Sequence, residues 1–102
     1  MVYSLEDIKK IIIPICIEYQ IEKAGVFGSY GKGQATENSD VDLLFQFNER
    51  FDLFLYNQFL DELQTRLKKV VDVLDYRCIW EAFRDDIEKS EVRIYEYHKT
   101  VA

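Results

Sequence analysis

Apolar residues recur at helical spacing near the start of the chain. Ser4 followed by Asp7 forms a capping box, a pattern typical of a helix start. The periodicity that follows predicts an amphipathic helix over residues 4–21, whose apolar face would consist of Ile8, Ile11, Ile12, Ile15 and Tyr19. Because an interior proline removes a backbone hydrogen bond, Pro14 predicts a bend at residues 11–13 or a helix that restarts there.

A second helical pattern occupies the middle of the chain. Asp52 is a suitable N-cap, and Lys68 and Lys69 follow the pattern where cations favour the helix dipole. We therefore expect a helix from Asp52 through about Leu67, with one apolar face formed by Leu53, Tyr56, Leu60, Leu63 and Leu67.

Four stretches have strand-like composition. Residues 24–27 form a short buried run, residues 41–47 and 70–75 are rich in β-branched and aromatic side chains, and residues 92–97 suit a final edge strand or an extended tail. Trp80, Phe83 and Ile87 suit a short helix before the last stretch. This alternation predicts an α+β fold of two layers, a small sheet with helices packed on it, and leaves parallel and antiparallel strand order open.

Composition limits the classes of protein. The chain has 102 residues, 48% of them hydrophobic, so we expect one domain over residues 1–102. Its net charge of −6, with scattered basic residues, argues against direct nucleic-acid binding. The longest apolar run, residues 11–17, is too short to span a membrane, and the charged start lacks a signal-peptide pattern. We expect a cytoplasmic protein in which Cys16 and Cys78 are buried thiols.

The four glycines of the chain, Gly25, Gly28, Gly31 and Gly33, cluster in one place and mark one unusual loop. Gly28 and Ser29 end the first strand, where glycine permits close backbone approach and the following turn can present N–H groups and a hydroxyl to a phosphate. The P-loop pattern is absent, since Lys32 lies between glycines and does not precede a Ser or Thr. Taken alone, without the carboxylates that follow, these glycines favour a tight surface turn.

Two aspartates begin the second strand. Because side chains alternate along a strand, Asp40 and Asp42 share a face with Leu44 and Gln46. At about 3.3 Å per residue, both carboxylates can reach a pair of divalent ions lying about 4 Å apart. Oxygen ligands favour Mg²⁺ or Mn²⁺ over zinc. The alternative is an ordinary solvated strand start.

A third acid interrupts the apolar strand over residues 70–75. Asp72 is flanked by valines that predict burial, and a buried acid needs a partner. If this strand lies beside the one that carries Asp40 and Asp42, Asp72 completes a cluster of three carboxylates. Asp75 has the opposite phase and is expected to be solvated or to cap the strand end.

The glycine-serine pair and the paired aspartates together resemble the signature of a known family. Gly28-Ser29, ten intervening residues and Asp40-x-Asp42 resemble the Gly-Ser…Asp-x-Asp signature of the DNA polymerase β-like nucleotidyltransferase superfamily. The residues around both motifs are similar to its minimal nucleotidyltransferase (MNT) branch, and the similarity extends over nearly the whole chain. The resemblance implies a nucleotidyltransferase fold and an enzyme that transfers a nucleoside monophosphate from a nucleoside triphosphate to a hydroxyl.

The resemblance also implies residue roles. Gly28 and Ser29 would hold the triphosphate of ATP, and Asp40 and Asp42 would ligate two Mg²⁺ ions. Asp72 would ligate the ion that activates the attacking hydroxyl. Three carboxylates suit such ions, which neutralise charge on the attacking and leaving oxygens.

The acceptor is expected on another chain, because a chain of this length has no room for an acceptor-binding domain. Stand-alone MNT proteins resemble antitoxins that pair with HEPN-domain toxins and transfer AMP to a tyrosine of the toxin. The resemblance thus implies a protein adenylyltransferase in a hetero-oligomer with a HEPN toxin. Two alternatives stay open: an antitoxin that neutralises the toxin by binding alone, and nucleotidyl transfer to a small molecule.

Other candidate residues carry less information. Tyr30 lies near the nucleotide base or packs under the glycine loop, and Lys32 is more often solvated than bound to phosphate. His98 has no second ligand or triad partner. Exposed tyrosines such as Tyr95 or Tyr97 would suit a partner interface.

Overall fold

The computed structural model describes residues 2–78 and 81–97. They form an α+β fold with one sheet of four strands, namely β1 (Lys23–Phe27), β2 (Val41–Gln46), β3 (Val71–Asp75) and β4 (Val92–Glu96). The strand order is β3-β2-β1-β4. β2 and β3 are parallel, whereas β1 is antiparallel to both β2 and β4. The predicted small sheet is therefore mixed, and the stretch near the C-terminus is an edge strand.

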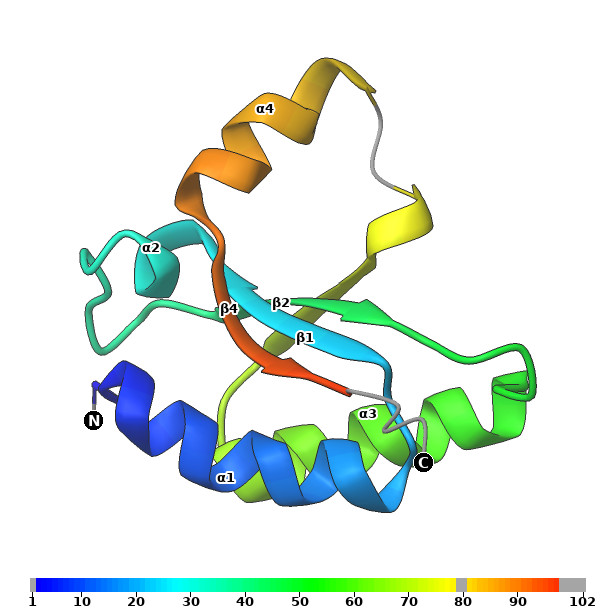
Figure 1. The fold of residues 1–102 in the computed structure, drawn as a ribbon. Coiled ribbons are helices and arrows are strands. Elements are labelled where there is room, and N and C mark those ends of the chain that lie inside the picture. Colours follow the sequence, from blue (N-terminus) through cyan, green and yellow to red (C-terminus); the bar gives the residue numbers. More distant parts are fainter. Residues whose placement is uncertain (1, 79–80, 98–102) are drawn as a thin grey trace.

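Two helices cover one face of the sheet, α1 (Leu5–Glu18) and α3 (Leu53–Leu67) (Figure 1). The Ser4 side chain accepts a hydrogen bond from the Asp7 N–H, and Asp7 reciprocates, so the predicted capping box is confirmed. α1 continues through Pro14, so the expected alternative of a restarted helix is wrong. Asp52 caps α3 by accepting from the Leu55 N–H at 2.8 Å.

The core lies between this face and the two helices. Its aromatic centre is Phe59 of α3, whose ring contacts Phe45 edge-on at 4.9 Å and Tyr19 at 5.2 Å between centroids. The predicted apolar face of α3 needs correction, because Leu53 is 74% exposed whereas Phe59 is fully buried. Leu53 stands in the first turn, before the helix lies against the sheet.

The opposite face of the sheet is covered more sparsely. A short helix α2 (Gly28–Gly31) follows β1 directly, η1 (Tyr76–Cys78) follows β3, and α4 (Glu81–Ser90) precedes β4. Figure 1 shows α4 on the side of the sheet away from α1 and α3. The expected short helix is confirmed as α4, while Trp80 lies outside the described residues. No helix within the described ranges is long and apolar enough to cross a bilayer.

Candidate functional site

The parallel pairing of β2 with β3 brings two predicted site residues together. Asp42 and Asp72 are register partners, so their side chains start from adjacent positions on the same face. On β2, Val41, Leu43 and Phe45 belong to the core, so Asp42 faces away from it. The side-by-side placement of Asp42 and Asp72, which sequence spacing left open, is confirmed.

The Asp42 carboxyl is strongly perturbed. Its pKa is raised from 3.8 to about 6, first by burial, then by a hydrogen bond and charge repulsion from Asp72, and last by the charge of Asp40. Asp42 is half-buried and Asp40 is exposed. The acids thus raise one another's electrostatic energy, which is a condition that a bound cation relieves.

Gly28 packs directly against Asp42. It has a positive φ of 65°, and a Cβ at this position would collide with the Asp42 carboxylate. Glycine therefore serves both the left-handed backbone and the close approach. The next residue, half-buried Ser29, lies in α2, the short helix that begins at Gly28. Gly28, Asp42 and Asp72 therefore meet at one end of the sheet.

A lysine outside the predicted site fixes the loop that leads to Asp40. Lys69 Nζ donates to the carbonyl oxygens of Glu37 at 3.0 Å and of Ser39 at 3.5 Å. The Ser39 hydroxyl in turn accepts from the Thr36 N–H at 2.9 Å. The loop before β2 is therefore tied to the start of β3, which limits the positions open to Asp40.

Part of the expected cluster is not formed. Asp72 was expected to be buried but is exposed, because β3 is an edge strand and its outer face is open. Within residues 2–78 and 81–97, no group of three or more acidic, histidine or cysteine side chains is close enough to hold a metal ion. Asp42 and Asp72 nevertheless offer the paired carboxylate oxygens that Mg²⁺ prefers, so the donor set fits such an ion.

The remaining sequence candidates have mostly structural surroundings. Tyr30 is 3% exposed and packs in the core, and its hydroxyl has no hydrogen-bond partner among the described residues. Lys32 is exposed. Burial raises the pKa of the Cys16 thiol to about 12, which fits an unreactive buried cysteine. Asp75 accepts from the Arg77 N–H at 2.8 Å, so its expected role at the strand end is confirmed. His98 and the side chain of Cys78 lie outside the described residues.

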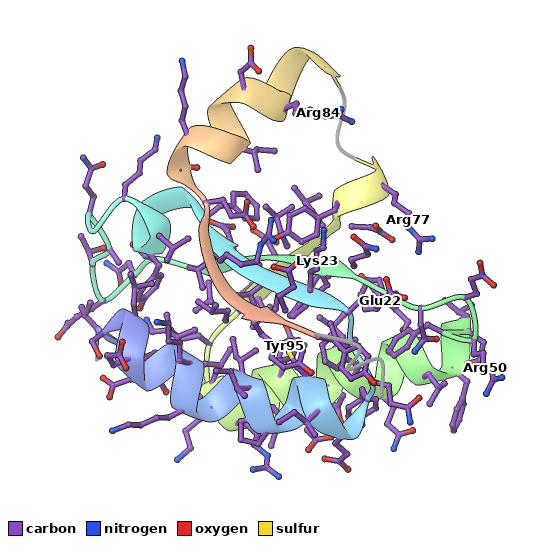
Figure 2. All side chains as sticks on the ribbon, in the orientation of Figure 1. Glu22, Lys23, Arg50, Arg77, Arg84 and Tyr95 are labelled. Carbon is purple, nitrogen blue, oxygen red and sulfur yellow. The ribbon has the colours of Figure 1, made fainter. Side chains whose placement is uncertain are left out.

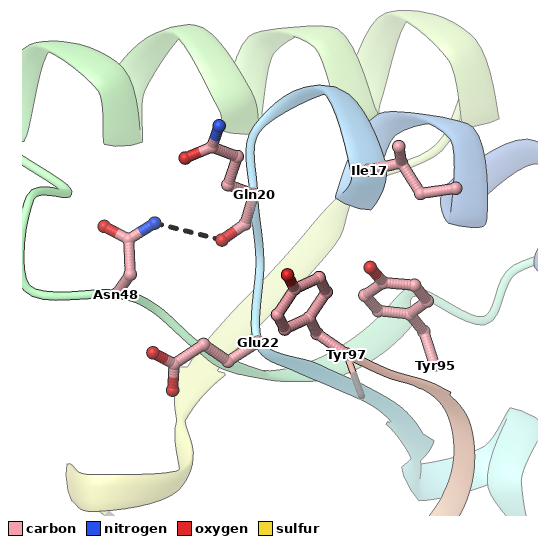
Figure 3. Close-up of a pocket in the computed structure, with 6 residues that line it drawn as sticks. All are labelled: Ile17, Gln20, Glu22, Asn48, Tyr95 and Tyr97. Carbon is pink, nitrogen blue, oxygen red and sulfur yellow. Dashed lines mark hydrogen bonds between the residues drawn. The ribbon is translucent and has the colours of Figure 1, made fainter. Parts of the chain in front are cut away.

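A separate pocket of about 460 Å³ opens at the other end of the sheet (Figure 3). Asn48 Nδ2 donates to the Gln20 carbonyl at its rim, 3.0 Å away, and Tyr97 is 60% exposed. At this end of the sheet, Lys23 at the start of β1 pairs with Gln46 of β2 and Glu96 of β4. Asp42 pairs with Phe27 at the opposite end of β1. The pocket is therefore remote from the aspartates.

The sequence reading missed a polar network on the same sheet face as Asp42. A Cβ on Gly25 would collide with the Glu91 carboxylate and the Tyr76 hydroxyl, which are hydrogen-bonded to each other. Burial, followed by Glu91, raises the pKa of Tyr76. Gly25 was grouped with the glycine loop, but a glycine inside a strand is itself a signal of close approach by another group.

Comparison with known proteins places these features in one family. Residues 9–100 match the family described as Polymerase beta, Nucleotidyltransferase. A protein of Methanocaldococcus jannaschii named "putative protein adenylyltransferase" is 35% identical over 91 residues, 89% of this chain and 98% of that protein. Protein adenylyltransferase MntA of Thermococcus cleftensis is 35% identical over 75 residues, 70% of this chain and 76% of MntA.

Solved structures share the fold. A chain in a toxin-antitoxin crystal structure with AMP-PNP has a TM-score of 0.73 at 20% identity, covering 87% of this chain and 73% of that one. A chain in the structure of the tri-AMPylated Shewanella oneidensis HEPN toxin with its MNT antitoxin has a TM-score of 0.65 at 16% identity, covering 87% and 70%. The match over residues 9–100 and the identity to the protein adenylyltransferases show that the chain belongs to the polymerase β nucleotidyltransferase family, as a minimal nucleotidyltransferase.

Proposed function

We propose that this nucleotidyltransferase transfers AMP from ATP to a tyrosine hydroxyl of a HEPN-domain toxin and thereby acts as its antitoxin. The observation that carries the proposal is the meeting of Gly28, Asp42 and Asp72 at one end of the sheet. Gly28 has a left-handed backbone and packs against Asp42, whose carboxyl has a pKa of about 6. This arrangement has no evident structural benefit.

Each site residue has a role in this proposal. The backbone around Gly28 and the Ser29 hydroxyl would hold the triphosphate. Asp42 and Asp72, which are already adjacent, would hold two Mg²⁺ ions together with Asp40, once the exposed Asp40 side chain moves closer to them. When bound, such ions neutralise charge on the attacking and leaving oxygens. The acceptor hydroxyl releases its proton to solvent and its oxygen bonds to the α-phosphorus of ATP, while the bond from that phosphorus to the oxygen that bridges to the β-phosphorus breaks and pyrophosphate leaves. The exposure of Asp72 is consistent with an acceptor that approaches from solvent.

The proposed partner rests on the relatives. MntA of Thermococcus cleftensis is named a protein adenylyltransferase, and the Shewanella oneidensis structure pairs an AMPylated HEPN toxin with an MNT antitoxin. A net charge of −6 suits a basic, RNA-cleaving partner. The proposal therefore places the chain in a cytoplasmic hetero-oligomer with such a toxin.

Intact-mass spectrometry tests this function. The chain is incubated with ATP, Mg²⁺ and a HEPN toxin encoded beside it, in parallel with the double variant Asp40→Asn/Asp42→Asn. Asp61→Asn, at an exposed position of α3, serves as the matched control for loss of one carboxylate. We expect adenylate on the toxin with wild type and with Asp61→Asn, and none with the double variant.

The same experiment separates the alternatives. No added mass, together with a stable complex from wild type and double variant alike, would favour an antitoxin that acts by binding alone. Full transfer by the double variant would show that the aspartates do not hold the catalytic ions.

A further inference from the structure

A second pocket lies on the same sheet face as Asp42. Its volume is about 390 Å³, and it is enclosed by β2, η1, α4 and the start of β4, with Leu44 and Gln46 contributed by β2. Leu44 lies two residues from Asp42 on the same face, a rise of about 7 Å. A group bound here is thus within one or two peptide units of the aspartates.

Three arginines and one acid, Glu91, line this pocket, and two acids outside its lining, Asp75 and Glu96, pair with two of the arginines. We call it the arginine pocket, after Arg77 of η1, Arg84 of α4 and Arg93 of β4. Figure 2 shows Arg77 near the end of the sheet and Arg84 above it on α4. Guanidinium groups pair with planar oxyanions in two-point geometry, so their convergence favours a carboxylate or phosphate ligand.

The arginines are held in place by the surrounding structure. Arg93 Nε pairs with Glu91 at 3.1 Å, and its guanidinium carbon lies 5.2 Å from the Tyr76 ring centroid. Arg77 donates to the Phe47 carbonyl at 3.1 Å. The missing side chain at Gly25 leaves the space that the Tyr76–Glu91 pair occupies. Arg84 is exposed on α4 and remains available to a ligand from solvent.

The position of the pocket argues against the phosphates of ATP as its ligand. Arg77 contacts Phe47, which follows β2, whereas Gly28 lies beside Asp42 at the strand's start. These two ends are five residues apart along β2, or about 16 Å. A triphosphate held at Gly28 and Ser29 does not reach Arg77, but an extended polypeptide that passes the aspartates does.

We propose that the arginine pocket docks an acidic segment of the acceptor polypeptide, next to the hydroxyl that receives the nucleotide; this inference rests on the proposed function. In a chain with a net charge of −6, most of the surface repels such a segment. A local cluster of arginines therefore sets the register of the acceptor on the sheet face, and the half-buried Ile87 contacts the methylenes of its acidic side chains.

The test is a titration of ¹⁵N-labelled chain, followed by the shifts of its backbone amides. The probes are the peptide Glu-Glu-Tyr-Glu-Glu and its counterpart with glutamine at every glutamate. We expect the acidic peptide alone to shift the amides of Leu44, Gln46 and Tyr76. Arg84→Glu should weaken its binding about tenfold or more, whereas Arg50→Glu, which changes the charge equally at an exposed loop position, should not.

Arg84→Gln repeats the measurement without charge reversal and should weaken binding in the same direction. Equal binding of both peptides, or unchanged binding by both Arg84 variants, would overturn the proposal. So would ATP that shifts the same amides and displaces the acidic peptide, because the pocket would then belong to the nucleotide. The titration involves no transfer, so a chain that binds the peptide but adenylylates nothing would refute the proposed function alone.

Discussion

The two faces of the sheet differ in what their residues do for the folded state. On β2, Val41, Leu43 and Phe45 are fully buried and pack under α1 and α3. On the other face of the same strand, Asp42 lies beside a second carboxylate and a glycine. One face therefore stabilises the fold, and the other retains charge repulsion and missing side chains at a cost in stability. Such a division is expected where function opposes stability.

The largest predicted effect is a loss of stability on substitution of a residue in the buried core face. Phe59→Ala removes a ring that contacts Tyr19, Phe45, Phe47 and Phe51. We expect a loss of about 3–5 kcal/mol in the free energy of unfolding, measured by urea denaturation, which leaves a small domain partly unfolded. Phe54→Ala, at a ring that is 77% exposed, should change it by less than about 0.5 kcal/mol.

The second prediction concerns the face that carries Asp42, where a substitution should reduce activity and leave the fold intact. Asp42→Asn should lower the rate of AMP transfer at least about a hundredfold, because charge that the transition state needs is removed. The rate is measured as pyrophosphate release at saturating ATP. A rate equal to that of Asp61→Asn would remove Asp42 from the catalytic site.

Two glycines with similar φ angles give a sharper comparison. Gly28 and Gly33 have φ values of 65° and 72°, but a Cβ on Gly33 meets nothing within 4 Å. Alanine at either position carries a strain of about 1–2 kcal/mol. Gly28→Ala should cost more than Gly33→Ala and should also abolish transfer, since it displaces the Asp42 carboxylate. Equal stability and equal activity of the two variants would show that the close approach has no role.

The smallest effect concerns pH. The Asp42 pKa is about 6 in the folded chain and 3.8 as the unperturbed value. The folded state therefore binds more protons between these values, and the stabilising contribution is full below pH 3.8 and lost as pH rises through 6. With EDTA present, the difference in unfolding free energy between wild type and Asp42→Asn should shift in favour of the variant from pH 4 to pH 7. A difference independent of pH would contradict the perturbed carboxyl.

Local signals were sufficient for much of this architecture. The capping box of Ser4 and Asp7 and the Asp52 cap depend on neighbours in sequence, and the structure confirms them. The alternation along β2 is confirmed from Val41 to Gln46 except at Leu44, which is buried on the face of Asp42. The placement of Asp72 beside Asp42 needed the strand order, and its exposure needed the edge position of β3.

Contacts between distant segments could not be predicted in the same way. Leu53 was expected on the buried face of α3 but is exposed, and Phe59, which was not in the predicted face, is fully buried. The position of α3 on the sheet decides which part of its surface is covered. The arginine pocket gathers residues from η1, α4 and β4, with Gly25 of β1 leaving room for them. No periodicity in the sequence links these positions.

The parallel pairing of β2 with β3 also has a consequence for folding kinetics. Gly28 and Asp42 can meet once the antiparallel pair of β1 and β2 has formed, whereas Asp72 reaches Asp42 only after the chain has crossed through α3. Contacts of greater sequence separation close a longer loop and form more slowly. The carboxylate pair is therefore completed late in folding. Until β3 pairs with β2, the chain has the contact between Gly28 and Asp42 but lacks Asp72 beside it.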